Sequence, residues 1–104
     1  MKPLLAFCAL VVGTAPLAHA DDIDSAYQAN VQSVGVPADS PAAAGPYGRQ
    51  MCDRLPATGF DPLVAAVNHE NPGLTMHQSA MVIGAAVANF CLDKSYLLPH
   101  DLKY

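Results

Sequence analysis

From residue 22 onward, apolar residues recur at intervals of three and four positions. This is the period of a helix that buries one side. Four such stretches lie between residues 22 and 92, and none of them alternates position by position as a half-exposed strand would. The pattern therefore predicts an all-α fold, a small bundle of about four short helices.

Capping and helix-breaking residues set the expected ends of the first two helices. The first covers about residues 22–34. The second begins either behind Ser40, a candidate N-cap, or at Gly45. It should end near Arg54, because Pro56 disfavours helical geometry at the residue before it.

The third and fourth helices have clearer start signals. Asp61 precedes a proline and is the expected cap of the third helix, which ends near Asn71 ahead of a Pro-Gly turn. Thr75 and Gln78 have the spacing of a capping box, so the fourth helix should follow Thr75 and end at about Leu92.

The fourth helix is the longest and most apolar stretch of this region, so we expect it at the centre of the bundle. Gly84 and Ala88 are small residues four positions apart, and they would permit close contact with another helix of the domain. The helical pattern fades after it. We expect residues 95–104 to form a loosely ordered tail, with residues 96–98 available to dock on the core.

The start of the chain has the features of a secretory signal peptide: a basic lead at Lys2, an uncharged apolar stretch over residues 4–17, and small residues at Ala18 and Ala20. The apolar stretch has about 14 residues, whereas a membrane-spanning helix needs roughly 20. A cleaved signal therefore fits better than a membrane anchor, with cleavage expected between Ala20 and Asp21.

Cleavage would leave residues 21–104 as a single domain, secreted from the cell or held in the cell envelope. A lipoprotein is disfavoured, because bulky Phe7 precedes Cys8 inside the apolar stretch. No later stretch approaches the length of a membrane span.

Removal of the signal changes the cysteine count. Cys8 leaves with it, and Cys52 and Cys91 remain as an even pair in an oxidising compartment. Each lies on the apolar face of its predicted helix, so a disulfide between them would join the second helix to the fourth. The alternative is two unpaired buried thiols. In the chain-entropy model, closing a loop of 39 residues stabilises the fold by roughly 4 kcal/mol.

Charge excludes two classes of partner. The chain has five Lys and Arg residues and nine Asp and Glu residues. Because Lys2 leaves with the signal, the mature part carries four cations against nine carboxylates, a net charge of −5 with neutral histidines. Four scattered cations form no phosphate-binding stripe, and an acidic domain is repelled by anionic membranes. We expect no nucleic-acid binding.

Several longer motifs bracket these features: Gly-x-x-x-Cys-x-x-Leu at residues 48–55, Asn-Pro-Gly-Leu-Thr at residues 71–75, and Phe-Cys at residues 90–91. With the acidic start of the mature chain, this arrangement resembles the DUF732 family of small exported proteins of mycobacteria and their relatives, over nearly all of residues 21–92. The sequence departs from the family pattern in its polar first helix and in the absence of a proline soon after Cys91. The resemblance implies export, helices and the disulfide, and it implies no activity.

The sequence motifs that could indicate a processing, metal-binding or catalytic site are weak. Residues 55–59 spell the sortase signal Leu-Pro-x-Thr-Gly, but no apolar segment and basic tail follow it. His69, Glu70 and His77 fit no zinc spacing, so surface histidines are the better interpretation. No nucleophile motif or phosphate-binding glycine loop occurs. We therefore expect no metal, no cofactor and no enzymatic activity.

Two functional hypotheses remain. The first is a non-catalytic interaction module that binds a protein or an envelope component through a helical face. The second is a carrier that holds a small apolar ligand between its helices, because methionine and aromatic side chains can line an adaptable pocket. The candidate lining residues are Met51, Met76, Met81, Tyr27, Tyr47 and Phe90.

Overall fold

The computed structural model describes residues 20–104, and the rest of the expected signal peptide lies outside the described residues. Every regular element in this range is helical, which confirms the all-α prediction. The elements are α2 (Ala20–Ser33), the 3₁₀ helix η2 (Pro41–Ala43), α3 (Gly45–Thr58), α4 (Phe60–Glu70), α5 (Met76–Phe90) and the 3₁₀ helix η3 (Leu92–Leu97).

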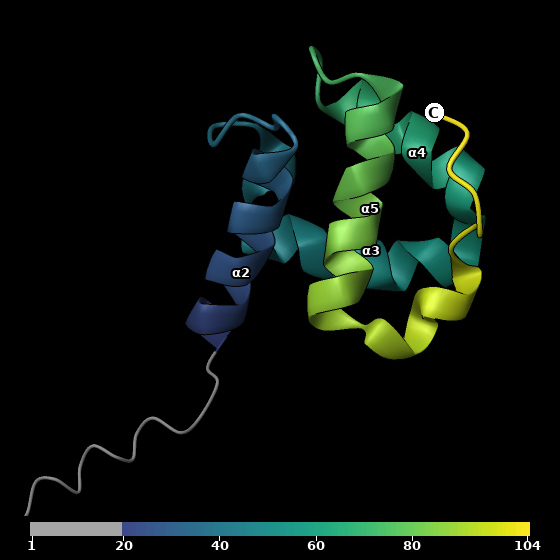
Figure 1. The fold of residues 1–104 in the computed structure, drawn as a ribbon, viewed down its shortest axis with the longest axis horizontal. Coiled ribbons are helices and arrows are strands. Elements are labelled where there is room, and N and C mark those ends of the chain that lie inside the picture. The colour runs from purple at the N-terminus through teal and green to yellow at the C-terminus, as the bar shows by residue number, and fades with distance from the viewer. Residues whose placement is uncertain (1–19) are drawn as a thin grey trace, which may run out of the picture.

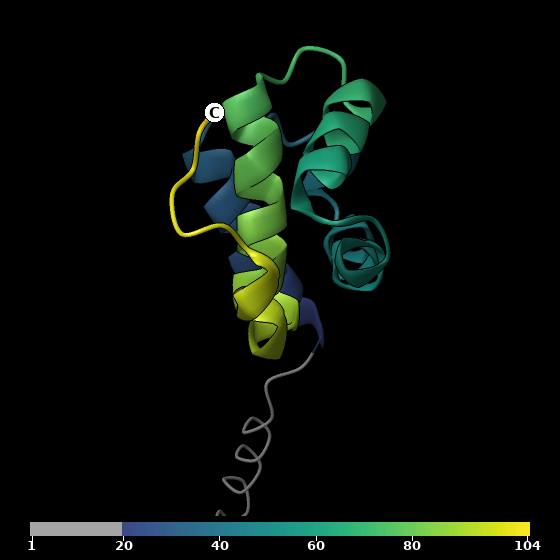
Figure 2. The same ribbon diagram turned by 90° about the vertical axis from the view of Figure 1, so that its right-hand side faces the viewer.

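The helix α5 lies at the centre, as its apolar character predicts. It contacts α2, α3, α4 and η3. Figure 1 shows α3 passing behind α2 and α5, and Figure 2 shows α4 beside α5 with the C-terminal segment on the other side. In residues 20–104, no helix combines the length and the apolar character needed to span a membrane.

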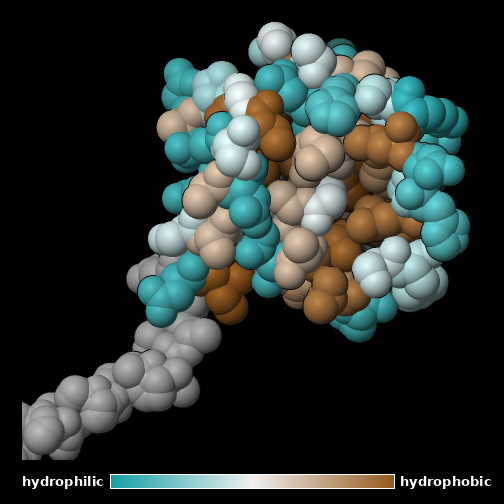
Figure 3. Space-filling model, in the orientation of Figure 1, coloured by the Kyte–Doolittle hydropathy of each residue, from teal (hydrophilic) through white to brown (hydrophobic). Residues whose placement is uncertain are grey.

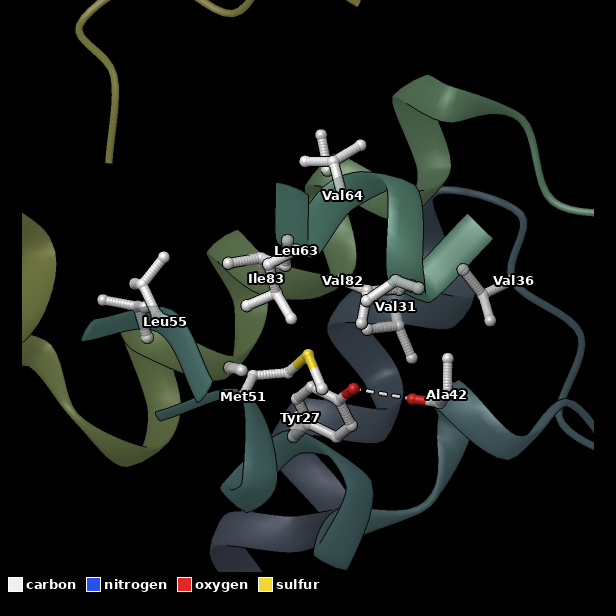
Figure 4. Packing of buried hydrophobic residues seen from close by; sticks show 14 of the residues in the cluster. Tyr27, Val31, Val36, Ala42, Met51, Leu55, Leu63, Val64, Val82 and Ile83 are labelled. Atoms are coloured by element: carbon white, nitrogen blue, oxygen red, sulfur yellow. Dashed lines mark hydrogen bonds between the residues drawn. The ribbon is translucent and has the colours of Figure 1, made fainter. Parts of the chain in front are cut away.

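One continuous core joins these helices (Figure 4). Tyr27 and Val31 from α2 meet Met51 and Leu55 from α3, and Ile83 comes from α5. All five side chains are fully buried. Burying such large apolar side chains stabilises a fold by roughly 1.5–3 kcal/mol each.

Helix α3 starts at Gly45 and ends later than predicted. The residues that follow Ser40 form the separate 3₁₀ turn η2, and α3 begins at Gly45. A helical element therefore starts at each of the two predicted positions. The end near Arg54 was wrong, because α3 includes Pro56 and continues to Thr58. A proline cannot donate to the carbonyl four residues earlier. Here that carbonyl, Cys52 O, accepts a hydrogen bond from Lys94 Nζ at 3.2 Å instead.

Helix α4 starts two residues earlier than predicted, at Phe60 instead of Pro62. Its N-cap is Gly59, with φ of 87°, so Asp61 and Pro62 lie inside the first turn. The positive φ explains the choice of residue, because glycine adopts this conformation at little cost. Gly59 thus forms the whole junction between α3 and α4.

The capping box at the start of α5 is present as predicted. Gln78 N donates to Thr75 Oγ1 at 3.0 Å, and Thr75 N donates to Gln78 Oε1 at 2.9 Å. The Gln78 side chain also donates to Val34 O at 3.2 Å. One side chain therefore caps α5 and fixes the end of α2 against it.

The expected close contact at Gly84 and Ala88 was wrong. A Cβ atom on Gly84 would have no neighbour within 4 Å, and Ala88 is exposed. The close approach lies at Gly48 on α3 instead. A Cβ there would come within 2.8 Å of the Tyr27 ring and 2.7 Å of the Phe90 ring. Glycine at position 48 lets α3 lie against both aromatic rings.

Part of the expected loose tail is regular, and two of the three residues expected to be available for docking do dock. Residues 92–97 form η3, and Leu97, Leu98 and Tyr104 pack against the core. Tyr96 does not dock, since 78% of it is exposed. The apolar residues of the tail follow neither a helix nor a strand period, because the segment beyond η3 is irregular. Periodicity therefore could not predict that these residues pack on the core.

Candidate functional site

The two mature cysteines are bonded to each other. Cys52 comes from the middle of α3 and Cys91 is the C-cap of α5, with Cα atoms 6.0 Å apart. This separation lies in the usual range for a disulfide. Both residues are buried, at 7% and 8% exposure. The bond therefore fixes the start of η3 to α3, which is a structural role.

A buried group of hydrogen bonds, which we call the Asn71 clasp, joins α2, η2 and α4 through Tyr27, Ala42 and Asn71. Tyr27 OH donates to Ala42 O at 2.6 Å, and Ala42 N donates to Asn71 Oδ1 at 2.8 Å. Asn71 is 1% exposed and also donates to Val67 O at 2.9 Å. Burial raises the pKa of Tyr27, so its hydroxyl stays a neutral donor.

The clasp continues to the surface. Asn71 Nδ2 donates to Tyr47 OH at 3.0 Å, and Tyr47 OH donates to Glu70 Oε1 at 2.6 Å. Arg54 binds both Glu70 oxygens, at 3.0 and 2.8 Å. The Arg54 guanidinium lowers the pKa of Glu70. Burial, followed by the bond to Glu70, raises the pKa of Tyr47 to about 12.

These contacts give the Asn-Pro-Gly-Leu-Thr motif a structural explanation. Asn71 anchors the clasp, Gly73 turns the chain with φ of 101°, and Thr75 caps α5. Leu74 is buried, and its carbonyl accepts from Asn68 Nδ2 at 2.7 Å. A neutral tyrosine and a carboxylate held by arginine provide neither a nucleophile nor a general base.

The structure does not bring the candidate metal ligands together. Glu70 is occupied by Arg54 and Tyr47, whereas His77 Nδ1 is 3.0 Å from the backbone oxygen of Tyr104. His69 and His100 are both exposed. Among the described residues, no group of three or more His, Cys, Asp or Glu side chains is placed to hold a metal ion.

The sortase-like letters at residues 55–59 form the junction of α3 and α4. Leu55 is fully buried, and Thr58 Oγ1 donates to Arg54 O at 3.1 Å. Residues 55–58 are thus the last turn of a helix, and Gly59 is the turn residue.

The residues suggested for a carrier pocket are scattered. Tyr27 and Met51 are fully buried in the core, and Tyr47 belongs to the clasp. Phe90 packs on Tyr27, with ring centroids 5.3 Å apart, and the Arg49 guanidinium lies 4.9 Å from the Phe90 ring centroid. Met76 is exposed and Met81 is partly exposed. The set does not surround one common cavity.

The predicted signal cleavage site stays a prediction. Ala18 lies outside the described residues, and Ala20 and Asp21 are described only as the first backbone positions of α2.

Two open hollows lie on the surface of the residues that the structure describes. The first, of about 490 Å³, lies beside the disulfide, and we call it the disulfide hollow. Its lining residues are Ile23, Arg49, Cys52, Asp53, Asn89 and Phe90. The second, of about 360 Å³, lies between the start of α4 and the C-terminal segment, and we call it the C-terminal hollow. Its lining includes Phe60, Pro62, Leu97, Leu98, Asp101 and Lys103.

Exposed large apolar side chains occur on η3 and on the C-terminal segment. Leu92 is 67% exposed and Leu102 is 39% exposed. Figure 3 shows hydrophobic surface in the middle of this face, on and beside α5, with hydrophilic residues along the outer edge where the C-terminal segment runs. Large contiguous apolar patches on a protein surface mark interaction sites.

The fold and this surface define a small, disulfide-stapled helical domain. Residues 21–93 match the family described as "Protein of unknown function (DUF732)", which is most of the chain. The chain belongs to this family, as its motifs indicated. No curated protein and no solved structure matches the chain.

Proposed function

We propose that this protein is exported and acts outside the cell or in the cell envelope as a non-catalytic module that binds a protein or an envelope component. The observation that supports binding most directly is the exposed apolar surface of η3 and the following segment, where Leu92 and Tyr96 are 67% and 78% exposed. A rigid, stapled scaffold that presents apolar side chains is suited to recognition.

Export is supported by two independent features. One is the order of basic lead, apolar stretch and small-residue site in residues 1–20. The other is the disulfide, because such bonds persist in oxidising compartments outside the cytosol. Intact-mass measurement of protein recovered from the medium or envelope should give a chain that starts at Asp21. Retention inside the cell with residues 1–20 attached would contradict export.

Binding is tested by photo-cross-linking. A photo-reactive phenylalanine analogue placed at Tyr96 should cross-link to one discrete partner in the envelope or the extracellular material. The matched control carries the same analogue at Asp39, an exposed position in the segment between α2 and η2. Identical products at both positions, or none at position 96, would count against an interaction module.

The carrier hypothesis lacks a comparable observation, because its candidate residues are divided among the core, the clasp and the surface. A bare polypeptide mass in native mass spectrometry of protein from its own host is the expected result.

A further inference from the structure

We propose that the C-terminal hollow is a docking site for a partner protein's segment in which an apolar side chain lies next to a lysine or arginine. This inference rests on the proposed binding function and names the chemistry of the partner.

The apolar part of the argument comes from the lining. Phe60, Pro62, Leu97 and Leu98 give the hollow an apolar surface from two segments that are far apart in the sequence. Its volume of about 360 Å³ is at the lower end of the roughly 300–1,000 Å³ of ligand pockets. A space of this size suits the anchoring side chains of a peptide segment.

The charged part comes from Asp101. Of the two carboxylates at the hollow, Asp61 is already bound by Lys103 Nζ at 3.3 Å and by Tyr104 OH at 2.8 Å. Asp101 pairs with no cation in residues 20–104. An unpaired carboxylate beside an apolar hollow is complementary to a cation next to an apolar anchor.

A second copy of the chain is a poor occupant, because each lysine and arginine of the described residues is already bonded. Arg49 pairs with Asp24, and Arg54 pairs with Glu70. Lys103 pairs with Asp61, and Lys94 donates to Cys52 O. A partner must therefore bring its own cation to Asp101. The disulfide hollow differs in charge, because its lining has one cation, Arg49, and one carboxylate, Asp53. The C-terminal hollow has two carboxylates, Asp61 and Asp101, against the single cation Lys103.

The probe is a set of three short synthetic peptides. The first contains leucine and lysine, the second replaces every lysine with glutamate, and the third replaces every leucine with serine. Of the three, the leucine–lysine peptide should bind most tightly, as measured by the shifts of the amide NMR signals of Leu97, Leu98 and Asp101 in the ¹⁵N-labelled, disulfide-bonded protein. The serine peptide tests the apolar anchor without any change to the fold.

Three variants test the charge. Asp101→Asn should lower the affinity for the leucine–lysine peptide about two- to fivefold, which corresponds to the free energy of an exposed ion pair. Asp101→Lys should transfer the preference to the leucine–glutamate peptide. Asp39→Asn removes the same charge at an exposed position away from the hollow and should leave binding unchanged.

Several results would overturn the inference. These are equal binding of the lysine and glutamate peptides, shifts spread over the surface, equal weakening by Asp39→Asn, or no binding. Signals of the hollow that depend on protein concentration without peptide would identify a second copy as the occupant. If position 96 cross-links a partner equally well in the Asp101→Lys background, this inference fails while the proposed binding function stands.

Discussion

The two ends of the described chain are fixed to the bundle by different kinds of contact. At the N-terminal end, α2 and η2 are held by the Asn71 clasp, whose central bonds are buried. At the C-terminal end, Leu98 and Tyr104 pack partly buried on the core. The polar contacts of residues 98–104 are the exposed bonds of Lys103 and Tyr104 to Asp61 and the contact of Tyr104 with His77. Breaking a buried bond leaves a polar group without water, whereas an exposed group exchanges its partner for solvent. The clasp should therefore control stability, and the C-terminal segment should control only the surface around the proposed docking site.

The disulfide lies in neither region but joins α3 to the end of α5, and its loss should have the largest effect. Replacing Cys52 and Cys91 together with alanine should lower the free energy of unfolding by about 4 kcal/mol, because the unfolded chain regains the freedom of a closed loop of 39 residues. In a domain of this size, that change lowers the melting temperature by roughly 15–30 °C. Circular dichroism during heating measures it.

A reductant provides the matched control for this prediction. It should lower the melting temperature of the parent protein to that of the double variant and leave the variant unchanged. Equal melting temperatures of the parent protein with and without reductant would show that the bond adds no stability.

The clasp should give the next largest effect. Asn71→Ala leaves the buried Ala42 N–H without its acceptor, a cost of about 1–3 kcal/mol, and also removes two donated bonds. Urea denaturation measures the loss. Asn30→Ala is the control, since it removes an exposed asparagine bond on α2 and should change stability by less than about 0.5 kcal/mol. Equal losses of stability in the two variants would show that the buried bonds of Asn71 stabilise the fold no more than an exposed bond does.

A pair of glycines sharpens the contrast between packed and open helix faces. Gly48→Ala should destabilise the protein by about 1–3 kcal/mol, because the new Cβ meets the Tyr27 and Phe90 rings. Gly84→Ala, on the open side of α5, should stabilise it by about 0.5–1 kcal/mol through better helix propensity. Destabilisation by Gly84→Ala in chemical denaturation would show that another element covers that face.

The sequence predicted the parts of the fold that depend on local rules. The period of apolar residues gave the helices, Thr75 and Gln78 gave the start of α5, and the inward faces of Cys52 and Cys91 gave the disulfide. The errors arose where a side chain far away in the sequence determines the end of a helix or the position of a close contact. Helix α3 passes Pro56 because Lys94, far away in the sequence, binds the carbonyl that the proline leaves free.

The candidate site was less predictable for the same reason. The C-terminal hollow combines Phe60 and Pro62 with Leu97 and Leu98, and no spacing rule connects these two segments. The expected role of Gly84 was wrong because a small residue permits a close contact without requiring one. Only the packing of Tyr27 and Phe90 shows that Gly48 is where the backbone must come close.

The C-terminal segment should give the smallest change in stability and the clearest response to pH. The bond from Tyr104, followed by that from Lys103, lowers the pKa of Asp61 below its usual value of 3.8. A carboxylate with a lowered pKa in the folded state holds its contacts fully above that usual value and loses them as the pH falls through the lowered one. Acidification below about pH 4 should therefore release residues 103–104 while the uncharged bonds of Asn71 persist. Amide NMR signals of Lys103 and Tyr104 should move in this range before those of Ala42.

Asp61→Asn should abolish the acid-range movement at Lys103 and Tyr104 with little change in melting temperature, and Asp39→Asn should preserve it. Persistence of that movement in Asp61→Asn would assign the pH response to another carboxylate, with Asp101 the first to test because it lines the same hollow.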